Sequence, residues 1–407
     1  MGAVTDAKMR RMPLPPGSVW LTVLLGLLVA LTPLGTDSYV PTLPAIAQAF
    51  GAPVSTVQFT ITTFFFGIAA GQLVWGPLSD RFARKPVLLC GLVLYLLSAL
   101  ACLDADSVAA IAFWRFVQGL GMSSGPVIAR TIVRDLHSHE QAARMLARMM
   151  VVFGVVPIAA PLMGAQLLVW WGWKGSFGLL ALVAVTLLLS VGIGLKETAP
   201  AGGGVMAPAH IARSFARILG DRRFVAPFMV MLGVQLGIFA FVTNSAFVLV
   251  KALGLSAREY SFLFATVMIG QIAGAWFTSR MVIRLGMAGM LRFGTRLACA
   301  SGALAAALAW GGVEHWLAIV LPFMAFMFAA SCVMPNATAA ALSPFPASAG
   351  TASSLLGACA FVFGAAVSMT LGALYDGSAR PLTGALALAG LWSLAAEHFL
   401  MRRRGLA

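Results

Sequence analysis

The segment Gly76-Pro-Leu-Ser-Asp80-Arg81-Phe-Ala-Arg84-Lys85-Pro86 places one acid and three bases between two long apolar runs. The run that leads into it covers residues 54–78, and the run that follows covers residues 86–104. Each has roughly the 20 residues that an α-helix needs to cross the ~30 Å hydrocarbon core of a bilayer. The segment is therefore predicted to be a tight, charged loop between two membrane helices.

The composition extends this prediction to the whole chain. Of its 407 residues, 60% are hydrophobic and only 10% are charged, whereas a soluble domain carries about 25% charged residues. The apolar runs are continuous rather than alternating, which favours membrane helices over the strands of a β-barrel.

Twelve such runs follow one another, near residues 20–49, 54–78, 86–104, 107–129, 145–168, 173–195, 224–250, 259–281, 289–309, 315–341, 350–374 and 381–400. The longest linker ends in a basic amphipathic stretch, residues 209–219, expected to lie on the membrane surface. We expect an all-α membrane protein with an N-terminal six-helix half at 1–196, a cytoplasmic linker at 197–223 and a C-terminal six-helix half at 224–407.

The basic residues indicate the orientation of these spans. Most of the 27 Lys and Arg residues fall in alternate connections, together with the two terminal segments. Because cytoplasmic loops carry the excess of Lys and Arg, both termini are predicted to be cytoplasmic. This asymmetry accounts for the net charge of +14, so no nucleic-acid partner is expected.

Two ionisable residues lie deep in apolar sequence, Asp37 in the first run and Arg115 in the fourth. A charge at membrane depth is costly and rare unless it is paired or functional. A carboxylate that binds and releases a proton there indicates ion-coupled transport, and a nearby guanidinium would tune its proton affinity. The alternative is a structural Asp37 that is permanently paired with Arg115.

The loop at 76–86 resembles the signature loop of the major facilitator superfamily, with Ala83 where the family has a second Gly. The resemblance implies the twelve-span major facilitator fold. It also implies a gate in which Asp80 meets the N-terminus of the eleventh span near Ser348. The gating residues would be Gly76, Asp80, Arg81, Arg84, Lys85, Gly350 and Thr351.

Two further motifs fit the same superfamily. Arg115-Phe-Val-Gln118-Gly119 resembles its R-x-x-Q-G pattern in the fourth span. The fifth span resembles, in a looser form, the antiporter motif of drug exporters, through Gly154, Pro157, Pro161 and Gly164. The alternative for this span is an ordinary kinked helix.

Two longer strings, residues 36–44 (TDSYVPTLP) and 335–355 (PNATAAALSPFPASAGTASSL), resemble the Bcr/CflA family of bicyclomycin-resistance-like drug:proton antiporters. One position differs, because Ser343-Pro344 stands where that family often has an acid. Polar and aromatic residues in the spans are candidates for a substrate cavity, with helix–helix or lipid contact as the alternative. They are Tyr39, Gln118, Gln235, Phe239, Asn244 and Asn336.

The resemblance implies proton-coupled efflux of small drug-like molecules across a bacterial inner membrane by alternating access. A proton-coupled metabolite exporter or importer of the same fold is the alternative. The spans carry no acid–base cluster or metal-binding spacing, so we expect no enzyme activity, no cofactor and no metal. The expected partners are an amphipathic drug, protons and the lipid bilayer, and the protein is expected to be a monomer.

Overall fold

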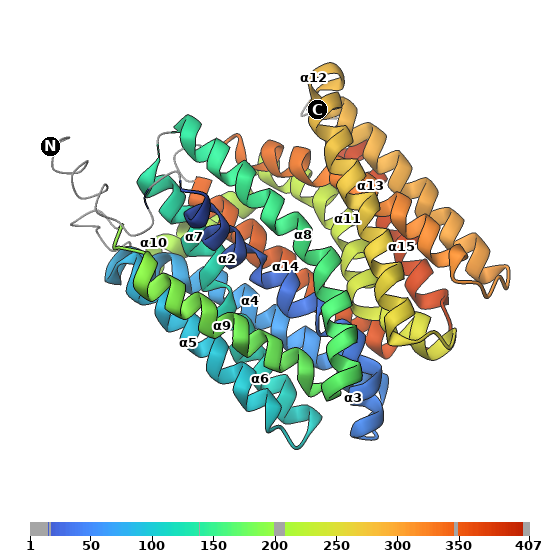
Figure 1. The fold of residues 1–407 in the computed structure, drawn as a ribbon. Coiled ribbons are helices and arrows are strands. Elements are labelled where there is room, and N and C mark those ends of the chain that lie inside the picture. The colour runs from blue at the N-terminus through green and yellow to red at the C-terminus, as the bar shows by residue number, and fades with distance from the viewer. Residues whose placement is uncertain (1–14, 16–17, 138, 199–207, 346–348, 402–407) are drawn as a thin grey trace, which may run out of the picture. The chain divides into compact units, whose positions relative to one another are not determined.

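The computed structural model describes all residues except 1–14, 16–17, 138, 199–207, 346–348 and 402–407, and the described part is almost entirely helical (Figure 1). Nine helices in this part are long and apolar enough to cross a membrane. The fourth predicted span is divided between two helices, the eighth and ninth lie in one helical run, and the twelfth is a shorter helix. Each of the twelve apolar runs thus corresponds to helical structure.

The contacts divide the chain into two units. The first contains residues 1–39 and 63–207, and the second contains residues 40–62 and 208–407. The second unit therefore includes the segment 40–62, which comes from the first two predicted spans. The expected division into a half at 1–196 and a half at 224–407 stays a prediction.

In the first unit, the helices are α2 (Val19–Asp37), most of α4 (Val54–Phe82), α5 (Arg84–Leu103), α6 (Val108–Met122), α7 (Ser124–Leu136), α8 (His139–Trp171) and α9 (Lys174–Gly194). Helix α9 lies between α2 and α5 (Figure 1). The fourth predicted span is split into α6 and α7 at Ser123, which is both the C-cap of α6 and the N-cap of α7.

In the second unit, the helices are the short α3 (Leu43–Ala49), the start of α4, α10 (Pro208–Gly220), α11 (Arg222–Ala246), α12 (Ala257–Trp310), α13 (Leu317–Leu342), α14 (Ala349–Ala373) and α15 (Arg380–Ala396). The expected amphipathic stretch forms α10, which packs on α11 and α14. A turn of π-helix extends α11 at Phe247–Ala252, and another extends α15 at Glu397–Met401.

The eighth and ninth predicted spans form a single 54-residue helical run, α12. Gly286 interrupts it with φ 67° and ψ 171°, a backbone conformation that glycine adopts without steric cost. The sequence predicts a loop between these two spans. The structure has two helices that meet at a kink at this one residue, because the positive φ of Gly286 interrupts the helical backbone.

Small residues allow two helices of the first unit to touch along their backbones. A Cβ added at Gly67 of α4 would collide with the carbonyl oxygen of Phe116 in α6. A Cβ added at Gly119 of α6 would collide with the carbonyl oxygen of Phe64 in α4. Association of membrane helices depends on such close contact, because lipid provides no hydrophobic driving force between them.

Candidate functional site

The two ionisable residues predicted to matter lie in the same region of the first unit. Asp37 is the last residue of α2 and is only 6% exposed, and Arg115 lies in the middle of α6 with no exposed surface. Arg115 donates a hydrogen bond of 3.0 Å from Nη1 to the carbonyl oxygen of Gly35, two residues before Asp37. The fold therefore brings together two residues that are 78 positions apart in sequence.

Within the described residues, Asp37 and Arg115 do not form an ion pair, and the Asp37 carboxyl makes no hydrogen bond. The permanent pairing considered as an alternative is therefore absent from this structure. Helix α2 ends at Asp37, where the Ser38 hydroxyl donates a 2.6 Å hydrogen bond to the carbonyl oxygen of Leu34. This bond holds the end of the helix without using the carboxylate.

The guanidinium of Arg115 is held by aromatic rings and uncharged polar groups. Its Cζ lies 3.7 Å from the ring centre of Phe64 and 4.4 Å from that of Tyr39. Nη1 also donates a 2.7 Å hydrogen bond to Oε1 of Gln118, one turn along the same helix. Cation–π contacts of this kind are strongest where the cation is removed from water. The site thus holds a permanent positive charge on α6 that is hydrogen-bonded to α2 two residues before the unpaired carboxyl group of Asp37.

The antiporter motif of α8 touches the same region through its last residue. A Cβ added at Gly164 would collide with the carbonyl oxygen of Ser38, the residue after Asp37. Gly154, the first residue of the motif, has open space around it, and Pro157 and Pro161 lie inside the continuous helix α8. Of the two glycines of the motif, Gly164 is the one that packs closely next to Asp37.

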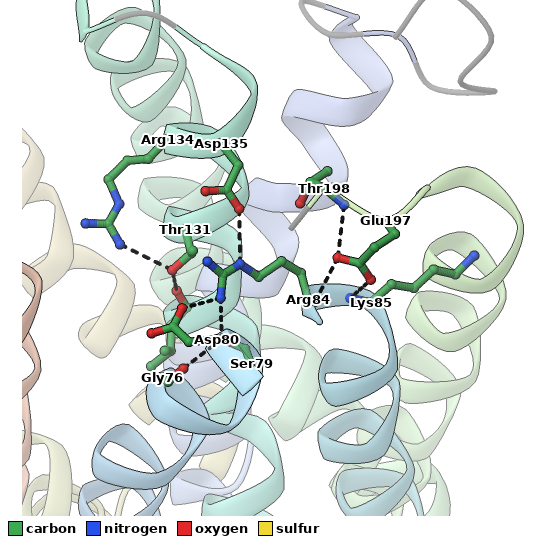
Figure 2. A network of polar contacts seen from close by, with 11 residues as sticks. Gly76, Ser79, Asp80, Arg84, Lys85, Thr131, Arg134, Asp135, Glu197 and Thr198 are labelled. Carbon is green, nitrogen blue, oxygen red and sulfur yellow. Dashed lines mark hydrogen bonds and ion pairs between the residues drawn. The ribbon is translucent and has the colours of Figure 1, made fainter. Parts of the chain in front are cut away.

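The predicted loop at 76–86 is instead the end of α4 and the start of α5, with only Ala83 between them. Its charged residues form a network (Figure 2). Arg84 pairs with Asp80 and also donates a 3.1 Å hydrogen bond from Nε to Asp135 at the end of α7. Its Nη1 reaches the hydroxyl of Ser79 at 3.2 Å, and that hydroxyl donates to the carbonyl oxygen of Gly76. The network ties the start of α5 to α4 and α7.

The carboxylate of Glu197 completes this network from the end of the first unit (Figure 2). It accepts hydrogen bonds from the backbone N–H groups of Arg84 (2.9 Å) and Lys85 (3.1 Å), the first residues of α5. Lys85 in turn donates a 2.7 Å hydrogen bond from Nζ to the carbonyl oxygen of Gly192 in α9. Glu197 thus acts as the N-terminal cap that the preceding residue, Ala83, does not provide.

The sequence analysis missed Glu197 and Asp135 because their partners lie far away along the chain. The signal in the sequence was Ala83, which stands where the signature loop has a glycine. The structure gives this residue φ 74°. A residue with a side chain in this conformation is strained, so it requires support from its surroundings. Of the other predicted gating residues, Arg81 lies over the ring of Phe82 at 4.9 Å.

The predicted partners of Asp80 belong to the second unit. Gly350 and Thr351 lie in the first turn of α14, where their carbonyl oxygens accept hydrogen bonds from the hydroxyl of Ser354. Ser348 lies outside the described residues. The gate contact between Asp80 and the eleventh span therefore stays a prediction.

The six predicted cavity residues fall into two groups. Tyr39 and Gln118 surround Arg115 in the first unit, and the other four lie on α11 and α13 of the second unit. Gln235 is half-buried, and Phe239 packs against Phe361 with 5.9 Å between ring centres. Asn336 donates a 2.8 Å hydrogen bond to the carbonyl oxygen of Cys332.

Asn244, the fourth residue of the second group, accepts a hydrogen bond from the side chain of Gln58. Gln58 lies in the second turn of α4 and is completely buried in the second unit. The sequence analysis did not select Gln58, because its partners are more than 180 residues away along the chain.

Comparison with known proteins gives the family. The family model described as Major Facilitator Superfamily matches residues 25–396. A bicyclomycin resistance protein homolog of Haemophilus influenzae is 30% identical over 382 residues, which cover 93% of this chain and 95% of the relative. Multidrug resistance protein D of Escherichia coli is 30% identical over 342 residues, covering 84% of this chain and 85% of the relative.

Solved structures agree on the fold. The crystal structure of a D-xylose–proton symporter matches with a TM-score of 0.73 at 16% identity, covering 94% of this chain and 97% of that one. These matches, together with the helices long enough to span a bilayer, describe a multi-pass membrane protein of a transporter family. The chain belongs to the Major Facilitator Superfamily and, within it, to the bicyclomycin-resistance-like family of transporters.

Proposed function

We propose that this protein exports small drug-like molecules across the bacterial inner membrane in exchange for protons. The observation that carries the proposal is the buried, unpaired carboxyl group of Asp37 at the end of α2, the helix to which Arg115 donates a hydrogen bond. An intramembrane ionisable residue is by default a candidate for function. The resistance proteins among the relatives support a drug as the substrate.

In this mechanism, Asp37 binds a proton when the site is open to the outside and releases it when the site is open to the inside. Arg115 is bound to a backbone carbonyl and two aromatic rings, so it can approach the carboxylate in another state without breaking an existing ion pair. One charge that moves through 100 mV provides about 2.3 kcal/mol, which corresponds to roughly a fifty-fold substrate gradient.

The orientation and the gate belong to the same proposal. Both termini and the loop at 76–86 face the cytoplasm, in agreement with the distribution of basic residues. Asp80 favours the state closed to the inside by its attraction to the N-terminus of α14, an arrangement that the helix dipole stabilises. The protein works as a monomer, and the amphipathic drug and the proton are its two substrates.

Transport in vesicles from an exporter-deficient bacterium tests the proposal. The substrate panel contains phenicols, bicyclomycin, sulfonamides and lipophilic cations, each with and without an uncoupler. Uncoupler-sensitive export of at least one of these compounds is the expected result. Transport of none of them, with proton movement on addition of a sugar or another metabolite, would support the metabolite transporter instead.

A further inference from the structure

A buried polar cluster in the second unit lies outside the proton site. Gln58, with no exposed surface, donates two hydrogen bonds from its Nε2 atom to α11. One goes to the carbonyl oxygen of Thr243 (3.2 Å) and the other to Oδ1 of Asn244 (2.5 Å). The second turn of α4 is thereby attached to the last turn of α11.

Asn244 donates one hydrogen bond and accepts another in this arrangement. Its Nδ2 donates a 2.8 Å hydrogen bond to the hydroxyl of Thr243, which in turn donates to the carbonyl oxygen of Phe239 at 2.8 Å. Asn244 is 3% exposed, and its acceptor is occupied by Gln58. The oxygen keeps a second lone pair, but it is buried under Gln58, so a substrate reaches it only after Gln58 has moved away.

The side-chain oxygen of Gln58 lacks a hydrogen-bond donor among the described residues. Across the described part of the chain, its Oε1 atom and the hydroxyl of Ser368 in α14 are buried without a hydrogen-bond partner. Gly372, one turn after Ser368, packs so closely that an added Cβ would collide with Oε1. A buried acceptor without a donor offsets part of what the two Nε2 bonds contribute. The attachment is held in place by packing, but its hydrogen bonding is incomplete.

We propose that Gln58 is a latch on Asn244 that a substrate releases by donating its own hydrogen bond to the Asn244 oxygen. This inference rests on the proposed transport function and assigns a specificity to it. Drugs with an N–H or O–H donor, such as phenicols, open the latch. A lipophilic cation without such a donor, such as tetraphenylphosphonium, leaves it closed.

A cysteine at position 368 reports on the latch. Because the Ser368 hydroxyl has no partner, Ser368→Cys removes no hydrogen bond. The five native cysteines are first replaced by alanine or serine. Reaction of the purified protein with a maleimide, followed by intact-protein mass spectrometry, then gives the rate at which this buried position becomes accessible.

Two variants open the latch in different ways. Gln58→Leu removes both donated hydrogen bonds, and Gly372→Ala displaces the glutamine through the collision with Oε1. Each should increase the labelling rate by at least about fivefold, the lower end of typical coupling between sites. The matched controls are Gln48→Leu at an exposed position of α3 and Gly384→Ala, where the added Cβ meets open space. Both controls should label like the parent.

Chloramphenicol should accelerate labelling in the parent but give no further increase in Gln58→Leu, and tetraphenylphosphonium should have no effect in either. Parent-like rates in both latch variants would overturn the latch, and acceleration by tetraphenylphosphonium would overturn its specificity. The variant rates are measured without a drug or a proton gradient. Fast labelling together with absent drug efflux would therefore refute the proposed function and leave the latch, whereas normal efflux with unchanged labelling would refute the latch alone.

Discussion

Arg115 donates a 3.0 Å hydrogen bond to the carbonyl oxygen of Gly35, and this bond anchors the guanidinium to the helix that ends at Asp37. The carbonyl of Gly35 lies within a helix that contains Pro33, and proline removes a backbone donor from such a helix. The fold therefore attaches the cation to the backbone of the helix that carries the carboxyl group of Asp37. Asp37 can change its charge while Arg115 keeps its present partners.

The first prediction concerns energy coupling. Asp37→Asn should abolish proton-driven drug efflux, because an amide of the same size cannot carry a proton. Folding should be preserved, since the Asp37 carboxyl has no hydrogen bond to lose within the described residues. Uptake of ethidium into everted vesicles, in which an exporter pumps inward, measures the effect with and without an uncoupler.

The matched control is Asp376→Asn in an exposed loop. Hydrogen bonds from Ser378, first from its hydroxyl and then from its backbone N–H, lower the pKa of the Asp376 carboxyl. That carboxylate is therefore ionised at neutral pH and is held by its own loop, so its replacement should leave efflux unchanged. Uncoupler-sensitive efflux in Asp37→Asn would rule out the proton role of Asp37.

The second prediction concerns Arg115. Arg115→Ala should abolish efflux and lower the unfolding temperature, because hydrogen bonds to a charged group are worth about 1.5–3 kcal/mol. Arg115→Lys should restore activity only in part, since lysine keeps the charge but loses the planar group that lies over Phe64 and Tyr39. Efflux is measured across a range of pH together with thermal unfolding in detergent.

Arg258→Ala is the control for this pair. Arg258 is exposed, and its Cζ lies 6.0 Å from the ring centre of Phe262. The alanine variant therefore also loses a cation–π contact, but at an exposed position. If Arg115→Ala kept both an unchanged pH profile and normal efflux, Arg115 would have no part in the coupling of protons to transport.

The third prediction concerns the antiporter motif. Gly164→Ala should lower the efflux rate at least about tenfold, because the added methyl group would displace Ser38 and with it the end of α2 at Asp37. Gly154→Ala introduces the same methyl group into open space in the same helix and should retain activity. Equal efflux by the two variants would show that contact with Ser38 is not required.

The fourth prediction concerns the cap of α5. Glu197→Gln removes the negative charge from the N-terminus of the helix but keeps an oxygen that can accept a hydrogen bond. Because Glu197 is exposed, the loss should be about 0.3–1 kcal/mol. Glu197→Ala removes both acceptors and should destabilise the protein further. Thermal unfolding in detergent orders the three proteins, and identical curves would exclude a capping role.

The fifth prediction concerns Asp80. Asp80→Asn should slow turnover and favour the inward-open state, with expression near normal, because Arg84 keeps its hydrogen bond to Asp135. Cysteine labelling from the cytoplasmic side should increase. If labelling were unchanged, Asp80 would order only its own loop. Ser343-Pro344 provides no acid on the other side of the predicted gate, so we expect this gate to depend strongly on Asp80.

The sequence by itself determined the helices and the family. Continuous apolar runs leave the backbone no option in lipid except internal hydrogen bonds, so run length predicts each membrane helix. The Asp80–Lys85 loop and the string at 36–44 carried the resemblance that the family comparison confirms. Asp37 and Arg115 stood out because charges are rare at membrane depth. These are local properties, readable without knowing which helices meet.

Only the tertiary structure decided which side chains meet. Glu197 reaches the start of α5 from 112 or 113 residues away, and Gln58 reaches Asn244 across 186 residues. Hydropathy and motif spacing act over a few helical turns and carry no information about such pairs. The same limit applies to Arg115: the sequence offered Asp37 as its partner, but in the fold its side chain reaches from α6 to the carbonyl of Gly35 in α2.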